Sequence, residues 1–175
     1  MVEFFNVTPD FAVGPQVVAE DLERLRAVGF ASVLNARPDD ETGLYLLSGD
    51  ARRIATDLGL AYAHSPTENH AIFEPDIIDQ FERALAELPK PIFAHCKSGT
   101  RAAILWALVA ARHRPVEEVI ATLRAAGQEF EFLEDELRES AEAARTSPFR
   151  LKPDLLLNLG QSRLLGTSPT PSDET

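Results

Sequence analysis

The stretch PIFAHCKSGTR, residues 91–101, places the only cysteine of the chain between a short apolar run and a strongly helical segment. We predict a buried strand over Ile92 to Ala94 and a buried helix over Ala102 to Ala111, so the residues between them form a strand-to-helix loop. Backbone N–H groups at such a helix start point outward and, with the positive end of the helix dipole, bind anions. The loop is therefore a candidate site for an anionic substrate.

Cys96 and Arg101 are the candidate catalytic residues of this loop. Outward-pointing amides at a helix start stabilise a thiolate, which is the reactive form of cysteine. Arg101 lies on the first turn of the helix, where its guanidinium offers a fixed fork of donors to an oxyanion. Glycine in the loop permits a tight turn around a bound anion. The predicted anion-binding loop consists of Lys97, Ser98, Gly99 and Thr100.

A purely structural explanation competes with this one. A single free cysteine is most often buried packing, and a solvated lysine such as Lys97 needs no function. A cysteine at a strand end, a turn of small residues and an arginine in the next helical turn together favour an anion site over packing. Strand alternation places His95 on the opposite side from Cys96. We therefore expect His95 to orient the loop through a hydrogen bond and not to act as a base.

Three stretches of the sequence together resemble a known family: FAVG at 11–14, GFASVLNARPD at 29–39 and CKSGTR at 96–101. They are similar to the phosphatase-like domain of bacterial beta-lactamase hydrolase-like proteins, also described as a sulfur transferase family. The resemblance covers residues 3–145. It implies a three-layer α/β fold like that of the cysteine phosphatases, with a mostly parallel central sheet and helices on both faces.

The length of the loop separates two chemistries within that resemblance. Tyrosine and dual-specificity phosphatases have five residues between the cysteine and the arginine, whereas this chain has four. Rhodaneses use the shorter spacing and enclose a single sulfane sulfur. The resemblance thus implies a sulfurtransferase in which Cys96 carries a persulfide and passes the sulfur to a small thiol or another nucleophile. One alternative is a phosphatase that hydrolyses phosphate monoesters through a cysteinyl-phosphate, and a second is a non-catalytic sensor of an anion or persulfide. In both enzymes the substrate is a small anionic sulfur or phosphate compound.

Composition argues against several classes of protein. With 17 Lys and Arg against 28 Asp and Glu, the chain has a formal net charge of −11, which disfavours nucleic acid and anionic membranes as partners. A single cysteine excludes an intrachain disulfide and a cysteine-rich zinc site. The longest apolar run is too short to span a membrane, and the first residues do not resemble a secretory signal. We therefore expect a cytoplasmic protein with a reduced thiol.

The sequence predicts one α/β domain over residues 1–145, followed by a tail over 146–175. Strands that alternate with helices indicate a parallel sheet. The tail is rich in Pro, Ser and Thr and contains a leucine cluster between residues 155 and 165, which we expect to contact a protein partner or the domain itself. The expected strands are 4–7, 11–13, 32–35, 61–64 and 92–94, and the expected helices are 17–28, 48–58 (capped by Ser48), 75–88, 102–111, 116–126 and 130–144.

Two further loops should reach the same edge of the sheet, because ligands of parallel α/β sheets bind beyond the carboxyl ends of the strands. Arg37, in one of them, is a candidate second cation for an anionic substrate, and Asn35 is expected to fix that loop through a side-chain hydrogen bond. Glu68, in the other, is the nearest substitute for the general-acid aspartate of the related phosphatases. His64 and His70 are too few for a metal site, so no metal or cofactor is expected.

Overall fold

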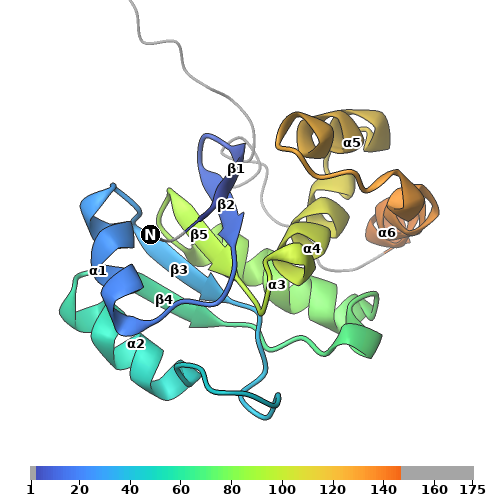
Figure 1. Ribbon diagram of the computed structural model, residues 1–175. Helices are drawn as coiled ribbons and strands as arrows, with labels where there is room; N and C mark the ends of the chain where they lie inside the picture. The colour runs from blue at the N-terminus through green and yellow to red at the C-terminus, as the bar shows by residue number, and fades with distance from the viewer. Residues whose placement is uncertain (1–2, 147–175) are drawn as a thin grey trace, which may run out of the picture.

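The computed structural model of the chain describes residues 3–146 and has a five-stranded sheet at its centre (Figure 1). The strand order is β1-β2-β5-β3-β4. β1 runs antiparallel to β2, and every other neighbouring pair is parallel. The predicted mostly parallel sheet is therefore confirmed, whereas the predicted leucine cluster of the tail lies outside the described residues. The strands are β1 (Phe5–Thr8), β2 (Phe11–Gly14), β3 (Ser32–Asn35), β4 (Ala61–His64) and β5 (Ile92–His95).

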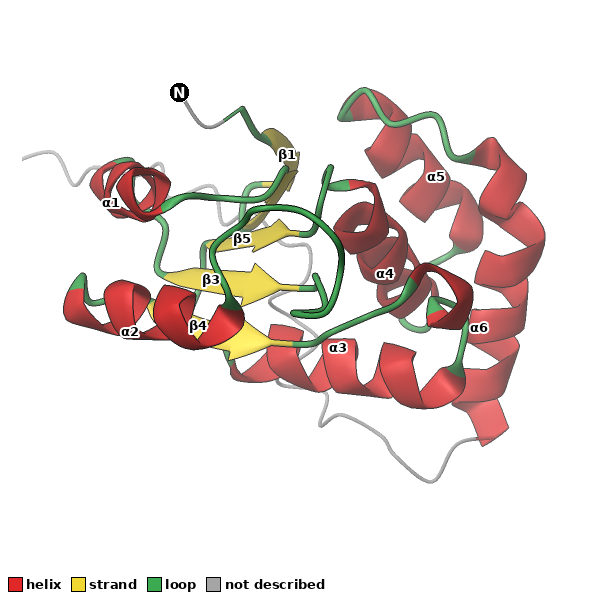
Figure 2. Cartoon of the chain, turned by 60° about the horizontal axis from the view of Figure 1, so that its bottom comes forward, coloured by secondary structure: helices red, strands yellow, loops and turns green. Residues whose placement is uncertain are grey.

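Helices cover both faces of the sheet, as predicted (Figure 2). One face carries α1 (Ala19–Ala27) and α2 (Ser48–Asp57), and the other carries α3 (Pro75–Glu87) and α4 (Thr100–Ala111). The last two helices, α5 (Val116–Ala125) and α6 (Glu134–Thr146), pack mainly against α4. Helix α4 is therefore enclosed between the sheet and other helices, which explains why its sequence is apolar almost all round.

Four helix starts differ from the prediction. Helix α4 begins at Thr100 and not at residue 102, and α6 begins at Glu134 and not at residue 130, after a 3-10 turn over Glu131–Leu133. Helix α1 begins after Val18, which keeps an extended backbone and donates its N–H to the Asp21 side chain at 3.2 Å. Ser48, expected as the cap of α2, is the first residue of that helix, and Leu47 takes the cap position. The Ser48 hydroxyl donates to the Asp39 carboxylate at 2.5 Å. This hydrogen bond ties α2 to the loop that follows β3.

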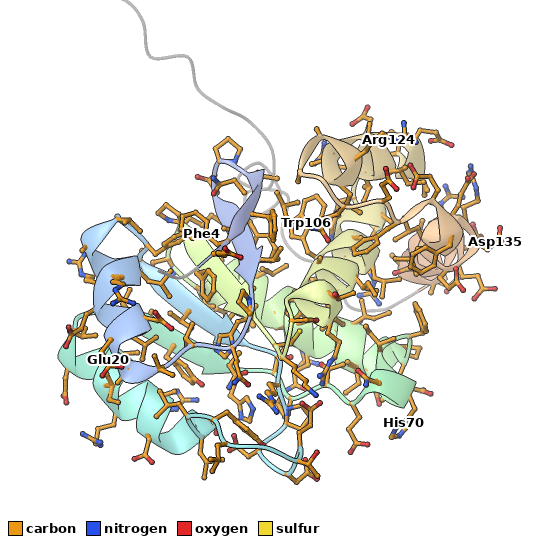
Figure 3. The ribbon with its side chains drawn as sticks, viewed as in Figure 1. Phe4, Glu20, His70, Trp106, Arg124 and Asp135 are labelled. Atoms are coloured by element: carbon orange, nitrogen blue, oxygen red, sulfur yellow. The ribbon has the colours of Figure 1, made fainter. Side chains whose placement is uncertain are left out.

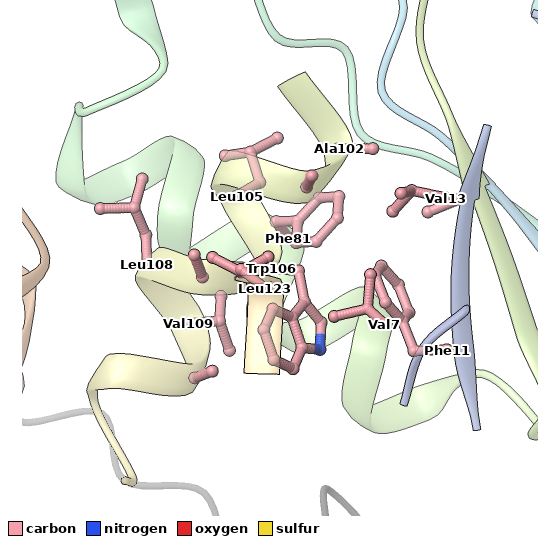
Figure 4. Packing of buried hydrophobic residues seen from close by; sticks show 14 of the residues in the cluster. Val7, Phe11, Val13, Phe81, Ala102, Leu105, Trp106, Leu108, Val109 and Leu123 are labelled. Carbon is pink, nitrogen blue, oxygen red and sulfur yellow. The ribbon is translucent and has the colours of Figure 1, made fainter. Parts of the chain in front are cut away.

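Side chains of β5 alternate between the two faces of the sheet and so divide the hydrophobic core. Phe93 belongs to the cluster beneath α1 and α2, whereas Ile92 and Ala94 belong to the cluster beneath α3 and α4. In the second cluster Trp106 of α4 stacks on Phe11 of β2, with 6.0 Å between the ring centroids (Figure 4). Burial on both faces fixes β5 and α4 relative to each other, and hence the two ends of the loop that joins them.

Candidate active site

The three predicted loops meet at the carboxyl ends of β3, β4 and β5. The N–H of Ala36 donates to the carbonyl of His95 at 2.8 Å, and the N–H of Ser65 donates to the carbonyl of Asn35 at 2.8 Å. A fourth loop, after β2, joins them, because the N–H of Gln16 donates to the carbonyl of Lys97 at 3.3 Å. The edge of the sheet that the topology predicts for a ligand is thus where the chain assembles its candidate residues.

Cys96 lies at the end of β5 with its side chain in the α3/α4 core, and only 1% of the residue is exposed. The N–H of Gly99 donates to its Sγ atom across 3.2 Å. The sulfur therefore faces a backbone donor just before the start of α4, where N–H groups favour bound anions. The role of Cys96 as a nucleophile stays a prediction.

Gly99 is a structural requirement of this loop. Its backbone is left-handed, with φ of 97°, immediately before α4. A Cβ atom there would lie 3.0 Å from the carbonyl oxygen of Gly14, at the end of β2. Gly14 is restricted as well, since a Cβ on it would approach the Phe93 ring to 2.8 Å. Two strands and the loop therefore come together only because both positions are glycine.

Arg101 lies on the first turn of α4 and is almost fully buried. Its Nη1 donates to the carbonyl of Thr67, in the loop after β4. Its Nη2 lies 2.6 Å from Oε1 of Glu41, in the loop after β3. The guanidinium therefore connects all three predicted loops, and its plane is fixed by two partners in different directions.

Arg37 is the second buried cation of the site. The Asn35 side chain accepts a hydrogen bond from the Arg37 N–H at 2.8 Å, which confirms the predicted role of that asparagine. The guanidinium lies over the Tyr45 ring, 3.6 Å from its centroid, and donates from Nη2 to the carbonyl of Thr42 at 3.2 Å. Its Nε donates to Oε2 of Glu41 at 2.8 Å. Arg37 and Arg101 thus share one carboxylate, and the structure brings the two predicted cations together.

Glu41 is the site residue that the sequence analysis misses. It lies in an acidic loop, residues 38–43, that the sequence marks only as a connection between β3 and α2. One signal was present, because Glu41 is four residues after Arg37 and the spacing permits a local ion pair. Nothing local distinguishes it from Asp39 and Asp40, and its contact with Arg101 depends on the folding of distant segments.

The remaining residues of the predicted anion-binding loop line its outer side. Lys97, Ser98 and Thr100 are exposed, and the Ser98 hydroxyl donates to the Thr100 hydroxyl at 3.2 Å. Their backbone amides stand where the sequence predicts an anion cradle. Their part in binding a substrate stays a prediction.

His95 does not form the hydrogen bond expected of it. Among residues 3–146 neither of its ring nitrogens has a hydrogen-bond partner, and the ring stacks on Phe93 with 6.0 Å between centroids. Alternation along β5 puts it on the same side as Phe93, away from Cys96, as predicted. Burial lowers the pKa of His95 to about 4. The residue is therefore a neutral packing element at neutral pH.

Glu68 is next in sequence to Thr67, whose carbonyl accepts a hydrogen bond from Arg101. The Glu68 side chain itself points to a different partner. Its carboxylate lies 3.2 Å from Nδ1 of His70, and its side chain is 58% exposed. Figure 3 shows His70 at the periphery of the molecule. A carboxylate in this position does not meet Arg101, so a role for Glu68 as general acid stays a prediction.

Metal-ligand clusters and membrane-spanning helices are both absent from residues 3–146. No group of three or more His, Cys, Asp and Glu side chains gathers there to hold a metal ion. None of the helices in this part of the chain is long and apolar enough to cross a membrane.

Comparisons with known proteins agree with this architecture. A family model described as "Beta-lactamase hydrolase-like protein, phosphatase-like domain" matches residues 3–113. A beta-lactamase hydrolase-like protein of Agrobacterium fabrum is 38% identical over 103 residues, which are 59% of this chain and 24% of that protein. One of Xylella fastidiosa is 32% identical over 107 residues, which are 61% of this chain and 25% of that protein. The chain thus spans about a quarter of the length of these relatives.

Solved structures share the fold. A Neisseria meningitidis protein described as a "putative phosphatase" has a TM-score of 0.67 at 23% identity, over 78% of this chain and 96% of that one. A kinase associated phosphatase with its catalytic cysteine replaced by serine has a TM-score of 0.63 at 15% identity, over 84% of this chain and 97% of that one. These likenesses confirm the predicted cysteine-phosphatase-like fold.

Proposed function

Because the chain belongs to the family of phosphatase-like domains of beta-lactamase hydrolase-like proteins, we propose that it is a cysteine-dependent hydrolase of small phosphate monoesters. This proposal reverses the order of the two activities expected from the sequence. The length of the loop favours sulfur transfer, whereas the family and the structural neighbours are described as phosphatase-like or phosphatases.

The observation that carries the proposal is the pairing of Cys96 and Arg101 across one loop. The Gly99 amide donates to Sγ of Cys96 at 3.2 Å, and Arg101 is held at the start of α4 by the Thr67 carbonyl and by Glu41. A thiolate beneath outward-pointing amides, with a buried guanidinium at the far end, supplies a nucleophile and positive charge for a phosphoryl group.

The proposed reaction has two steps. The Cys96 thiolate attacks phosphorus, so that an S–P bond forms while the bond from phosphorus to the leaving oxygen breaks. Arg101 and the loop amides stabilise the charge on the non-bridging oxygens. Water then attacks the cysteinyl-phosphate, which releases inorganic phosphate and restores the thiolate. Arg37, joined to Arg101 through Glu41, is a second buried cation next to Arg101.

Sulfur transfer is the second candidate, and a specific observation favours it. Only four residues separate Cys96 from Arg101, and a short loop encloses a smaller space than one with five. The Glu68 carboxylate pairs with His70 at the surface, which leaves a phosphate leaving group without help from that acid. In this second reaction the Cys96 thiolate attacks the sulfane sulfur of an anionic donor such as thiosulfate, and the S–S bond of the donor breaks with release of sulfite. A small thiolate then takes the outer sulfur of the Cys96 persulfide, which releases the Cys96 thiolate.

Intact mass after incubation with each substrate separates the two functions. The probes are an aryl phosphate, whose leaving group departs without a general acid, and thiosulfate followed by cyanide. We expect a phosphate adduct on Cys96 and release of inorganic phosphate. Formation of a persulfide without phosphate release would overturn the proposal in favour of sulfur transfer. Neither adduct, with no turnover of either probe, would favour a binding protein.

Matched variants identify the residues responsible. Cys96→Ser should abolish adduct and turnover. Arg101→Ala should reduce turnover strongly, whereas Arg53→Ala removes the same charge from an exposed pair with Asp50 and should leave turnover unchanged. Equal losses in the two arginine variants would mean that net charge, and not the loop, determines the activity.

A further inference from the structure

The carboxylate of Glu41 occupies the space between the two buried arginines of the site. One oxygen, Oε1, lies 2.6 Å from Nη2 of Arg101, and the other, Oε2, lies 2.8 Å from Nε of Arg37. The two guanidinium groups come from different loops, and a single anion joins them. Their arrangement is that of a site for an anionic group, filled by a side chain of the protein.

Burial shows which partner of this cluster is able to leave. The side chains of Arg37 and Arg101 are 3% and 7% exposed, whereas that of Glu41 is 24% exposed. Withdrawal of a buried guanidinium would need rearrangement of the core, but water already reaches the carboxylate. Glu41 is therefore the movable member of the cluster.

Each arginine keeps its position without Glu41. Arg101 donates to the Thr67 carbonyl, while Arg37 donates to the Thr42 carbonyl and stacks on Tyr45. The backbone of Glu41 is also held, because the Tyr45 hydroxyl lies 2.9 Å from its carbonyl oxygen. Rotation of the Glu41 side chain alone then uncovers two fixed cations.

We propose that the space between Arg37 and Arg101 is a second anion subsite beside the Cys96 loop, and that Glu41 fills it in the unliganded protein as a stand-in for the ligand. The ligand class is a substrate with two anionic groups, one over Cys96 and a carboxylate or phosphate that displaces Glu41. A planar guanidinium matches such a group through two parallel hydrogen bonds. The inference rests on the proposed function only for the role of the first anionic group.

The test compares two probes in the Cys96→Ser protein, which binds without turnover. Phenyl phosphate carries only the reacting group, and 4-carboxyphenyl phosphate carries a second anion. Glu41→Gln removes the competing charge but keeps the shape of the side chain. Calorimetric binding should then show at least a tenfold gain for the carboxylated probe and less than a threefold change for phenyl phosphate, as expected for release of a charge-assisted contact.

Controls separate displacement from other roles of Glu41. Glu118→Gln makes the same chemical change on α5, where the exposed Glu118 pairs with the half-buried Arg114 that precedes the helix, and it should change neither affinity. Adding Arg37→Gln to Glu41→Gln should remove the gain. Glu41→Asp, which is too short to reach both arginines, should give a smaller gain and guards against misfolding of the glutamine variant.

The proposal has clear contrary outcomes. Weaker binding of both probes by Glu41→Gln would mean that Glu41 positions Arg101 and does not compete with the ligand. An unchanged preference between the probes would show that no second subsite exists. Failure of every variant to bind either probe would overturn both the second subsite and the anion site of the Cys96 loop. Binding is measured without chemistry, so absence of phosphatase turnover in the native protein would overturn the proposed function alone.

Discussion

Arg101 depends on the direction of its donors as well as on its charge. Its Nη1 and Nη2 atoms contact the Thr67 carbonyl and Glu41 on different sides. A lysine ammonium cannot reproduce a planar fork, so Arg101→Lys should lower kcat/KM nearly as much as Arg101→Ala. Loss of a charged hydrogen bond of roughly 1.5–3 kcal/mol corresponds to a decrease of about tenfold to hundredfold. Near-normal kcat/KM in the lysine variant would reduce the role of Arg101 to that of a point charge.

His95 should make the fold sensitive to acid. Burial lowers its pKa from 6.5 to about 4, so the unfolded chain binds a proton more readily than the folded one. The contribution of neutral His95 to the free energy of unfolding is therefore fully present above about pH 6.5, and it is lost as the pH falls toward 4. At roughly 1.4 kcal/mol per pKa unit, this loss is about 3 kcal/mol. Urea unfolding at several pH values should show a flatter profile for His95→Phe, and parallel profiles would contradict the assignment.

At the residue scale, local chemistry was predictable and long-range chemistry was not. The hydrogen bond from the Arg37 N–H to Asn35 follows from sequence spacing alone, since it joins residues two positions apart. The contact between Glu41 and Arg101 joins loops that follow different strands. Only the folded sheet brings them together, so a sequence pattern carries no sign of it.

Helix α4 supports the site through the burial of Trp106. Its indole stacks on Phe11 (Figure 4) and is 2% exposed. Trp106→Ala leaves a large cavity and should lower the free energy of unfolding by about 3–5 kcal/mol, which corresponds to a melting temperature lower by about 10 °C or more. Trp106→Phe should lower the free energy of unfolding much less. Equal melting temperatures for the alanine variant and the native protein would show that α4 does not depend on this contact.

Strands and helices were largely predictable at the level of elements. The strands Ser32–Asn35 and Ala61–His64 have the predicted bounds, because apolar runs ended by turn residues give a clear signal. Helix starts were less certain. Ser48 has the residue type of a cap, yet its hydroxyl donates to Asp39, a partner that the local sequence does not reveal.

The net charge of the whole molecule opposes the approach of the anions that we propose as its substrates. Its formal net charge is −11, while Arg37 and Arg101 supply positive charge only locally. Raising the salt concentration from about 10 to 150 mM shortens the screening length from roughly 30 to 8 Å and should reduce this repulsion. The alkylation rate of Cys96 by anionic iodoacetate should therefore rise about two- to threefold relative to neutral iodoacetamide. If the ratio of the iodoacetate rate to the iodoacetamide rate falls as salt is added, the local positive potential outweighs the net negative charge.

The order of the strands is the feature of the whole molecule that the sequence left open. Alternation of strands and helices predicts a parallel sheet, but it does not place β5 between β2 and β3. That central position brings the Gly14 carbonyl against Gly99 and sets the Cys96 loop beside the loop that carries Arg37. The strand order is decided by pairing between strands that are distant in sequence. Such pairing produces no periodic pattern in the local sequence, so it could not be predicted.

The interval between Cys96 and Arg101 is a property of the loop, whereas the positions of its two ends are set by β5 and α4. Cys96 is anchored by β5 and Arg101 by α4, and the four residues between them include Lys97 and Ser98 at the surface. Insertion of one residue between Lys97 and Ser98 would change the spacing between Cys96 and Arg101. It would need no substitution in either hydrophobic cluster. We expect such a change to alter the anion that the proposed site accepts, while substitutions in the two hydrophobic clusters alter stability.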